Sequence, residues 1–201
     1  MNDIVTNLTT VATFSEDGSK RYLLRKTWDT SRPRMAIIML MPSEATGIAL
    51  DYTTMLVLNN AVRLGFGGVD IVNLFSTLND FTLRKTEDQD VENQDVILQT
   101  LQAVDTIVYA PGLGKSKNKI FQKRQLQILE LLRPFESKLH CLCNAKGKGR
   151  FQHPLSPTVR EWRLSPMKIE ELTSAPSLSL TTEEAPQQPQ RSSRKSKPTK
   201  K

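Results

Sequence analysis

The chain is poor in the residues that build metal sites, disulfide frameworks and long base-stacking platforms. Only two cysteines and two histidines occur among its 201 residues, and aromatic residues make up 6%. Two cysteines in a chain of this length argue against a fold stapled by disulfides. So few aromatic side chains argue against a long groove that stacks the bases of a single strand, so any ligand site is expected to be one pocket.

The sequence also lacks long apolar runs. None approaches the roughly 20 residues that a membrane-spanning helix needs. Residues 1–4 have neither the basic nor the apolar region of a signal peptide. We therefore expect a cytoplasmic protein with no membrane partner. Nothing in the sequence indicates its oligomeric state.

Positive charge is present but unevenly placed. The net charge is +7 and the isoelectric point is near 9.5. Six basic residues but only two acidic ones follow Thr173, among Ser, Pro and Gln residues that cannot bury enough apolar area to fold. We expect a single domain over residues 1–172 and a disordered basic tail over 173–201. The tail is either a nucleic-acid arm, with Arg194, Lys195 and Lys197 contacting phosphates, or a solubilising end.

Local patterns predict an α/β domain. Asp17-Gly18 between the apolar runs 11–14 and 22–24 predicts an N-terminal β-hairpin, with 22–28 as a longer edge strand. Strands are expected at 35–40, 69–72, 106–109 and 138–143, separated by helices at about 55–64, 91–103 and 117–132. This alternation predicts a three-layer fold with a mostly parallel four-stranded central sheet. Residues 158–162 read as a short strand or extension, and residues 166–172 as a brief helix.

Each of the four central strands runs into a loop of polar, Gly or Pro residues. The carboxyl ends of parallel strands gather along one rim of an open sheet, where ligands bind. The candidates in these loops, or at the start of the helix that follows them, are Pro42, Ser43, Asp51, Thr53, Asn73, Phe75, Gly112, Lys146, Lys148, Arg150 and His153. Asp51 and Thr53 are also the possible N-caps of the first helix.

The loop at 111–116 suggests a phosphate site. It follows a strand and ends in Gly114-Lys115-Ser116, but a true P-loop has a glycine five residues before Gly114, where this chain has Tyr109. Hydrolysis of a nucleoside triphosphate is therefore the weakest hypothesis. The alternative is a plain anion site at the following helix N-terminus, formed by Lys115 and Lys117.

The fourth loop combines a basic turn with a histidine. Lys146, Lys148 and Arg150 suit contact with phosphates, or form a solvated turn. His153 stands directly after them and is a candidate donor to an oxygen that gains negative charge. His140 lies inside a strand and is expected to be structural.

Cys141 and Cys143 alternate onto one face of a predicted strand, and we expect buried thiols. A Cys-x-Cys zinc pair is the alternative, but the only nearby imidazoles are His140 and His153. We expect neither a metal nor another cofactor.

Five motifs in order resemble a family of small bacterial and phage proteins labelled only as a domain of unknown function. The family pattern is Asn-Pro-Ser-x-Ala, Asp-x-Thr, Gly-Gly, Asn-Leu-Phe and His-Pro-Leu. This chain matches it over about residues 11–165, with motifs that begin at Pro42, Asp51, Gly67, Asn73 and His153.

The same order is more remotely similar to the uracil-DNA glycosylase superfamily, which implies a nucleobase site. The similarity implies that Asn73 and Phe75 bind the base and that His153 stabilises the leaving base. Met41 stands where those proteins have Asp or Asn, and a thioether cannot orient a water. Either Asp51 or Ser43 takes that role, or this chain has lost the chemistry.

The leading hypothesis is a glycosylase-like protein that binds or acts on a nucleobase in nucleic acid or a nucleotide. The alternative is a non-catalytic module for nucleic-acid or protein interaction with a degraded site. Fold-level similarity alone is a weak warrant for function. If Ser43, Asp51, Asn73 and His153 converge around one concave pocket, the hypothesis of a site survives, whereas dispersal over the surface leaves only a scaffold.

Overall fold

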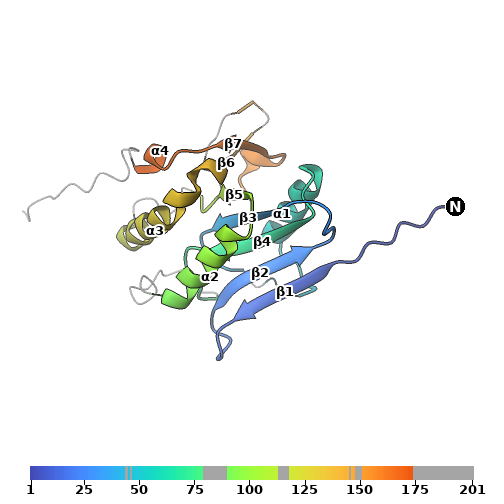
Figure 1. Ribbon diagram of the computed structural model, residues 1–201, viewed down its shortest axis with the longest axis horizontal. Helices are drawn as coiled ribbons and strands as arrows, with labels where there is room; N and C mark the ends of the chain where they lie inside the picture. The colour runs from blue at the N-terminus through green and yellow to red at the C-terminus, as the bar shows by residue number, and fades with distance from the viewer. Residues whose placement is uncertain are drawn as a thin grey trace, which may run out of the picture.

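The computed structural model contains one seven-stranded mixed sheet in the order β1-β2-β4-β3-β5-β6-β7. It describes residues 1–43, 45, 47–78, 90–112, 118–144, 146–147 and 151–173. The strands are β1 (Thr9–Phe14), β2 (Arg21–Thr27), β3 (Arg34–Met39), β4 (Gly68–Asn73), β5 (Thr106–Tyr109), β6 (Leu139–Cys143) and β7 (Arg163–Pro166). Figure 1 shows β1 and β2 continuing the sheet beyond β4.

The predicted four-stranded, mostly parallel sheet is therefore wrong. The four central strands β4-β3-β5-β6 are parallel, but β2 pairs antiparallel with β4, β1 with β2, and β7 with β6. The predicted hairpin is present, yet its second strand is an interior strand rather than an edge strand. Local sequence predicts a hairpin but not which strand it pairs with, because that pairing joins residues far apart in the chain.

Four helices accompany the sheet: α1 (Tyr52–Arg63), α2 (Val91–Gln102), α3 (Lys119–Leu132) and α4 (Glu170–Thr173). The first three begin at side-chain caps supplied by Asp51, Asp90 and Asn118, which accept hydrogen bonds from backbone amides of the first turn. Asp51, and not Thr53, is thus the cap of α1. In the part of the chain that the structure describes, short 3₁₀ helices cover Arg133–Lys138 and Pro157–Val159.

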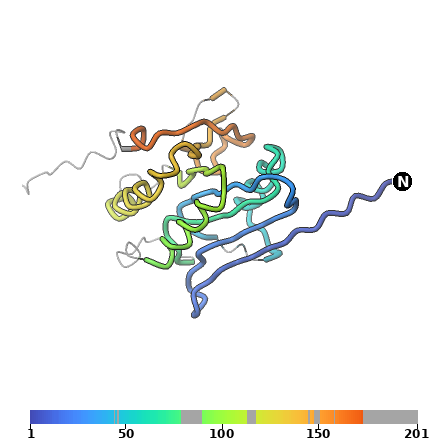
Figure 2. The backbone as a smooth tube through the Cα atoms, in the orientation of Figure 1, coloured from blue at the N-terminus to red at the C-terminus, as the bar shows by residue number. Residues whose placement is uncertain are grey.

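Each face of the sheet has its own apolar core. Ile97 of α2 and Ile128 of α3 pack with Val72 and Ile107 on one face. On the other face, Val57 of α1 and Trp162 pack with Ile37. The tube drawing of the backbone follows these layers along the chain (Figure 2). The three-layer arrangement is as predicted. Because the helices cover the two faces of the sheet, the loops lie at the ends of the strands.

Other expectations have mixed outcomes. The last strand follows the predicted range 158–162, because residues 157–159 form a 3₁₀ turn that begins at Pro157. Cys141 and Cys143 are free and buried, which confirms that prediction. No helix of the described segments is long and apolar enough to cross a membrane. The predicted tail lies outside the described residues from Ser174 onward.

Candidate functional site

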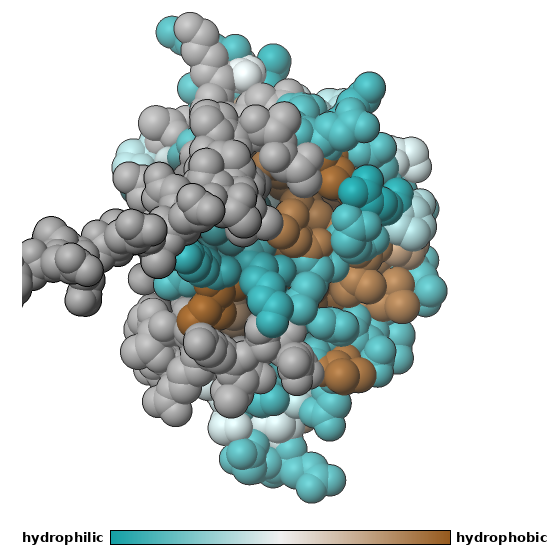
Figure 3. Space-filling model, turned by 90° about the vertical axis from the view of Figure 1, so that its left-hand side faces the viewer, coloured by the Kyte–Doolittle hydropathy of each residue, from teal (hydrophilic) through white to brown (hydrophobic). Residues whose placement is uncertain are grey.

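A polar cluster of Arg21, Ser43, Asp51 and His153 lies at the carboxyl ends of the parallel strands. β2 runs antiparallel to β4, so Arg21 at the start of β2 lies at the same rim as the end of β4. Figure 3 faces this side of the molecule, where hydrophilic surface surrounds several separate apolar patches. The rim is where ligands bind in open α/β sheets.

A bulge in β2 aims Arg21 at this cluster. Leu23 pairs with Thr13 and Arg21 pairs with Phe14, so Tyr22 is an extra residue on β2. A bulge re-aims side chains by breaking the alternation of the strand. The Tyr22 hydroxyl donates to Glu92 of α2 on one face, whereas Arg21 reaches the opposite, α1 face. In a regular strand without the bulge, Arg21 and Leu23 would point to the same face, because residues two positions apart share a face.

The Arg21 side chain is buried, and backbone oxygens hold it in place. Its Nη1 donates to the carbonyl oxygens of Ser43 at 3.0 Å and Ala45 at 2.6 Å, and the residue is 1% exposed. Its Nε and Nη2 have no hydrogen-bond partner within the described part of the chain. Burial lowers the pKa of Arg21 to about 10, and the nearby Asp51 carboxylate acts against that shift. The guanidinium is therefore charged at neutral pH.

Asp51 serves as a helix cap and as the negative charge of the cluster. Its Oδ1 accepts from the Thr54 backbone amide at 2.6 Å, which fixes the carboxylate at the start of α1. Burial alone would raise the pKa of Asp51. Hydrogen bonding from Ser43 and Thr54, with the positive charge of Arg21, outweighs burial and holds that pKa below its usual range. Asp51 is thus an ionised carboxylate beside a serine hydroxyl.

His153 completes the cluster from the loop after β6. Burial lowers the pKa of His153, and the Asp51 charge opposes that shift, so the ring is neutral at pH 7. Its Nδ1 accepts from the Leu155 backbone amide at 3.1 Å, which leaves the single ring proton on Nε2. The imidazole therefore offers an Nε2–H donor in its neutral form.

Gly112 allows the His153 loop to approach the end of β5. Its φ is +78°, and a Cβ at this position would lie 3.0 Å from the His153 Cβ. Both features disfavour any larger residue. Gly112 thus positions His153 by close packing, with no side chain of its own to offer a ligand.

Asn73 ends β4 on the same face as the cluster. Its alternation with Val69 and Ile71, which belong to the α1-face core, places its side chain on that face. The residue is 1% exposed, and neither its amide oxygen nor its amide nitrogen has a partner among the described residues. A buried amide without partners costs roughly 1–3 kcal/mol. Unsatisfied groups of this kind mark positions where a ligand or an ordered water belongs.

The structure does not bring every predicted residue to this cluster. Pro42 is buried beside it and Thr53 is half-buried in the first turn of α1, whereas Phe75 is wholly buried in the α2-face core. Met41 packs against that same core. Lys146 is exposed in a turn, where its amide donates to Asn144 Oδ1. Residues outside the described part of the chain are Lys115, Lys117, Lys148, Arg150, Arg194, Lys195 and Lys197.

Two residues of the site have no signal in the linear sequence. Arg21 sits in a strand whose simple alternation gives the wrong face. Tyr52 is 55% exposed at the start of α1, and the Arg160 guanidinium lies 5.6 Å from its ring centroid and donates to its hydroxyl. Because Tyr52 directly follows Asp51, its ring is an exposed aromatic surface at the edge of the cluster. Only the cap geometry of α1 would have suggested it.

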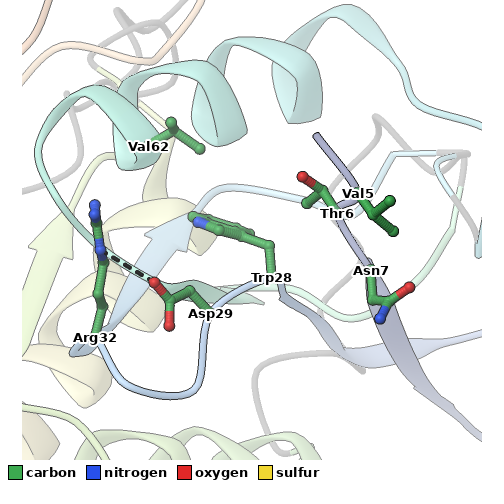
Figure 4. A pocket seen from close by; sticks show the side chains of 7 residues that line it. All are labelled: Val5, Thr6, Asn7, Trp28, Asp29, Arg32 and Val62. Carbon is green, nitrogen blue, oxygen red and sulfur yellow. Dashed lines mark ion pairs between the residues drawn. The ribbon is translucent and has the colours of Figure 1, made fainter. Parts of the chain in front are cut away.

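A separate groove lies at the opposite ends of the parallel strands. It has a volume of about 420 Å³ and is lined by Val5, Thr6, Asn7, Trp28, Asp29, Arg32 and Val62. In Figure 4, the Trp28 ring lies between Val62 of α1 and the segment that carries Val5 and Thr6. The Asp29–Arg32 ion pair of 3.1 Å flanks it. Trp28 directly follows β2, the strand that Arg21 begins, so this groove lies at the other end of that strand and is not part of the cluster.

The cluster contains the elements of acid–base and hydrogen-bonding chemistry. An ionised carboxylate, a neutral imidazole with a free donor and an arginine fork lie at one rim. The donor set is poor for a metal, because no three His, Cys, Asp or Glu side chains of the described residues gather in metal-binding geometry. What the arrangement can do is bind a polar ligand with oxygen acceptors and support charge changes on it.

The comparisons with known proteins give a family but no activity. The family model described as "Protein of unknown function (DUF1643)" matches residues 21–155, which span the sheet from β2 to the His153 loop. No curated protein and no solved structure gives a significant match. The matched segment is more than half of the chain and contains Arg21, Asp51, Asn73 and His153. The chain therefore belongs to the DUF1643 family of proteins of unknown function.

Proposed function

We propose that the protein binds a nucleobase, in nucleic acid or in a nucleotide, at the rim cluster, and that the cluster acts on the base's bond to its sugar. The supporting observation is the buried, unpartnered amide of Asn73 on the same rim and face as Asp51 and His153. The remote similarity to uracil-DNA glycosylases noted from the motifs agrees with this assignment as an analogy of fold.

The Asn73 amide fits the polar edge of a base. An amide presents one acceptor and one donor side by side, so it pairs with a base edge that carries an N–H next to a carbonyl. Uracil, thymine and guanine have such an edge. Adenine and cytosine carry an amino group beside a ring-nitrogen acceptor, and the same amide can bond to that edge as well, so the amide by itself does not select among the bases.

Asp51 and His153 supply the chemistry in this proposal. As the bond between base and sugar breaks, the leaving base gains negative charge on a carbonyl oxygen. His153, which is neutral, donates a hydrogen bond from its Nε2–H to that oxygen and so stabilises the negative charge. The Asp51 carboxylate stabilises the positive charge on the sugar, orients the attacking water and accepts the proton that this water loses as it bonds to the sugar. The leaving base, which keeps the electron pair of the broken bond, then takes up a proton from solvent. Ser43, hydrogen-bonded to Asp51, holds the carboxylate in place.

The alternative is recognition without hydrolysis. Met41 occupies the position that the resembling families fill with Asn or Asp, and it packs into the opposite core. That observation favours a binding module if Asp51 does not reach the sugar. Release of free base separates the two functions, because a binding module retains affinity for the base and releases none.

The test compares two buried asparagines on the α1 face. Asn73→Leu should abolish binding of deoxyuridine in calorimetric titration while leaving the free energy of unfolding unchanged or higher, because an apolar side chain of similar shape replaces an unpartnered amide. Asn60 bonds to Leu56, Arg160 and Trp162, so Asn60→Leu should lower stability by about 1–3 kcal/mol.

Base release is measured in parallel with uracil-containing single-stranded and duplex DNA and with free nucleotides. Wild-type protein that binds none of the five nucleosides, or Asn73→Leu protein that binds deoxyuridine as well as wild type does, would contradict the proposed function. Binding without base release would favour the non-catalytic alternative.

A further inference from the structure

Arg21 keeps the bidentate edge of its guanidinium free inside the protein. Nε and Nη2 lie on one edge of the group, and both are buried without partners in the described residues. Nη1, on the other side, is held by the carbonyl oxygens of Ser43 and Ala45. Arginine donors this deeply buried are normally paired, because desolvating a charged group is costly.

Two other arginines of this chain show what that edge binds. Arg25 donates from Nε and Nη2 to the two carboxylate oxygens of Asp70, each at 2.7 Å. Arg133 uses the same two atoms on Glu130, at 2.6 and 2.8 Å. In both pairs, one planar fork meets two oxygens of one anion.

We propose that the Nε/Nη2 edge of Arg21 is a binding site for an oxyanion, a phosphate or carboxylate group of the ligand. The bulge at Tyr22 aims the side chain toward the rim, and the two backbone carbonyls fix the plane of the fork before the ligand arrives. Ser43, Asp51 and His153, the other members of the cluster, are half-buried, so the cluster reaches the protein surface next to the buried Arg21.

The local charges allow such a group to bind. The N-terminus of α1, which has no acidic residue in its first turn, adds partial positive charge at this rim. Asp51 opposes binding of an anion. The balance predicts a specific sign: removing the Asp51 charge strengthens the oxyanion site, whereas removing the Arg21 fork weakens it.

This site makes the proposed function more specific. If the base pocket exists, a phosphate bound at Arg21 identifies the ligand as a nucleotide or a nucleic-acid strand and not a free base or nucleoside. That last step rests on the proposed function. Oxyanion binding itself does not, because it depends only on Arg21 and its surroundings.

The test follows phosphate binding to full-length protein by calorimetric titration at constant ionic strength, and in every protein that keeps Arg21 also by the Arg21 Nε–H resonance in NMR. We expect a saturable shift for wild type. Arg21→Lys should weaken phosphate binding about 10- to 100-fold, the loss expected for one charge-assisted hydrogen bond of about 1.5–3 kcal/mol. Arg133→Lys is the matched control and should bind phosphate as wild type does, because its fork is occupied by Glu130.

Further titrations separate the outcomes. Asp51→Asn should tighten phosphate binding, and acetate titrated in place of phosphate tests the carboxylate source. An Arg21 resonance that moves with neither anion means that the fork holds only water, and overturns the inference even if Arg21→Lys does not fold. Deoxyuridine binding combined with an Arg21 resonance that does not shift on addition of phosphate also overturns the inference. Phosphate binding without nucleoside binding supports this site and contradicts the proposed function.

Discussion

Two polar clusters at the same rim each combine a helix-capping aspartate, a serine and a basic residue. In the closed cluster the basic residue is paired with the aspartate, and in the open cluster it is not. On the α2 face, Asp90 caps α2, accepts from Ser76 Oγ at 2.5 Å and pairs with Lys20 Nζ at 2.9 Å. On the α1 face, Asp51 caps α1 and is hydrogen-bonded to Ser43, and the positive charge of Arg21 lies near its carboxylate. The Nε/Nη2 fork of Arg21, however, has no acidic partner among the described residues. Lys20 and Arg21 are neighbours in the chain, and the strand turns them to opposite clusters.

From this difference we infer that the closed cluster is structural and that the open cluster binds a ligand. In the closed cluster, carboxylate, hydroxyl and ammonium satisfy one another, so the cluster ties β2, the end of β4 and α2 together. In the open cluster, Arg21 and Asn73 retain buried donors without a hydrogen-bond partner among the described residues. Unsatisfied buried groups lower stability, so a protein that keeps them is set up for a partner that satisfies them.

The largest expected effect is on chemistry in the open cluster. If His153 stabilises an oxyanion, His153→Ala should lower transition-state stabilisation by about 2.7–4 kcal/mol, the amount lost with one such donor. Stability should change far less, because a rim residue supports little of the core. Base-release kinetics and thermal melts measure the two quantities.

The second histidine provides the control. His140 lies in β6, and its ring contacts the Lys138 carbonyl at 2.9 Å, away from the cluster. His140→Ala should leave base release unchanged. A lowered melting temperature for His153→Ala with unchanged ligand binding would identify His153 as structural.

The closed cluster should dominate stability. Asp90→Asn removes a partly buried ion pair and should lower the free energy of unfolding by about 2 kcal/mol. Asp51→Asn keeps a good helix cap and loses no direct ion pair, so it should cost about 0.5–1 kcal/mol. Denaturant titration measures both. Equal losses would mean that the two clusters are equivalent and that the open one is part of the framework.

Gly112 tests whether its contact with His153 positions the site. Gly112→Ala places a side chain at φ +78° and should cost about 1–2 kcal/mol from backbone strain. Gly18→Ala carries the same strain at φ +70° with open space around it. Gly112→Ala should lose more stability than Gly18→Ala, because it adds the close contact with His153 to the same backbone strain, and only Gly112→Ala should lose nucleobase binding. Similar binding by the two variants would show that the close approach has no role in the site.

The smallest expected effect is a pH dependence from His153. Its pKa is lowered on folding, so between that value and 6.5 the unfolded chain binds more protons than the folded protein. This contribution to stability is present above pH 6.5 and lost as the pH falls through the folded pKa. Comparing melts of wild type and His153→Gln from pH 7.5 to 5 measures it. A wild-type curve parallel to the variant would contradict the burial of a neutral imidazole.

Much of the framework was predictable because it depends on residues close together in the chain. The apolar spacing of α1, α2 and α3, the Asp17-Gly18 turn and the Asp51 cap are local signals, and each appears in the structure. The rim loops followed from the order of the elements. Ser43, Asp51 and His153 were therefore expected at one rim, although the sequence could not say which face each would share.

The sequence by itself determined the helices, the central strands, the hairpin and the family of the chain, because periodicity, turn residues and motifs act over a few residues. Only the tertiary structure decided that the hairpin joins the sheet through β4, that Tyr22 bulges, and that Arg21 thereby reaches the α1 face while Lys20 pairs with Asp90. The pairing of β2 with β4 joins residues about 45 positions apart, and the bulge depends on the register of β2 against β1, so no local pattern fixes either feature. As a result, Lys20 lies in the closed cluster and its chain neighbour Arg21 lies in the open cluster.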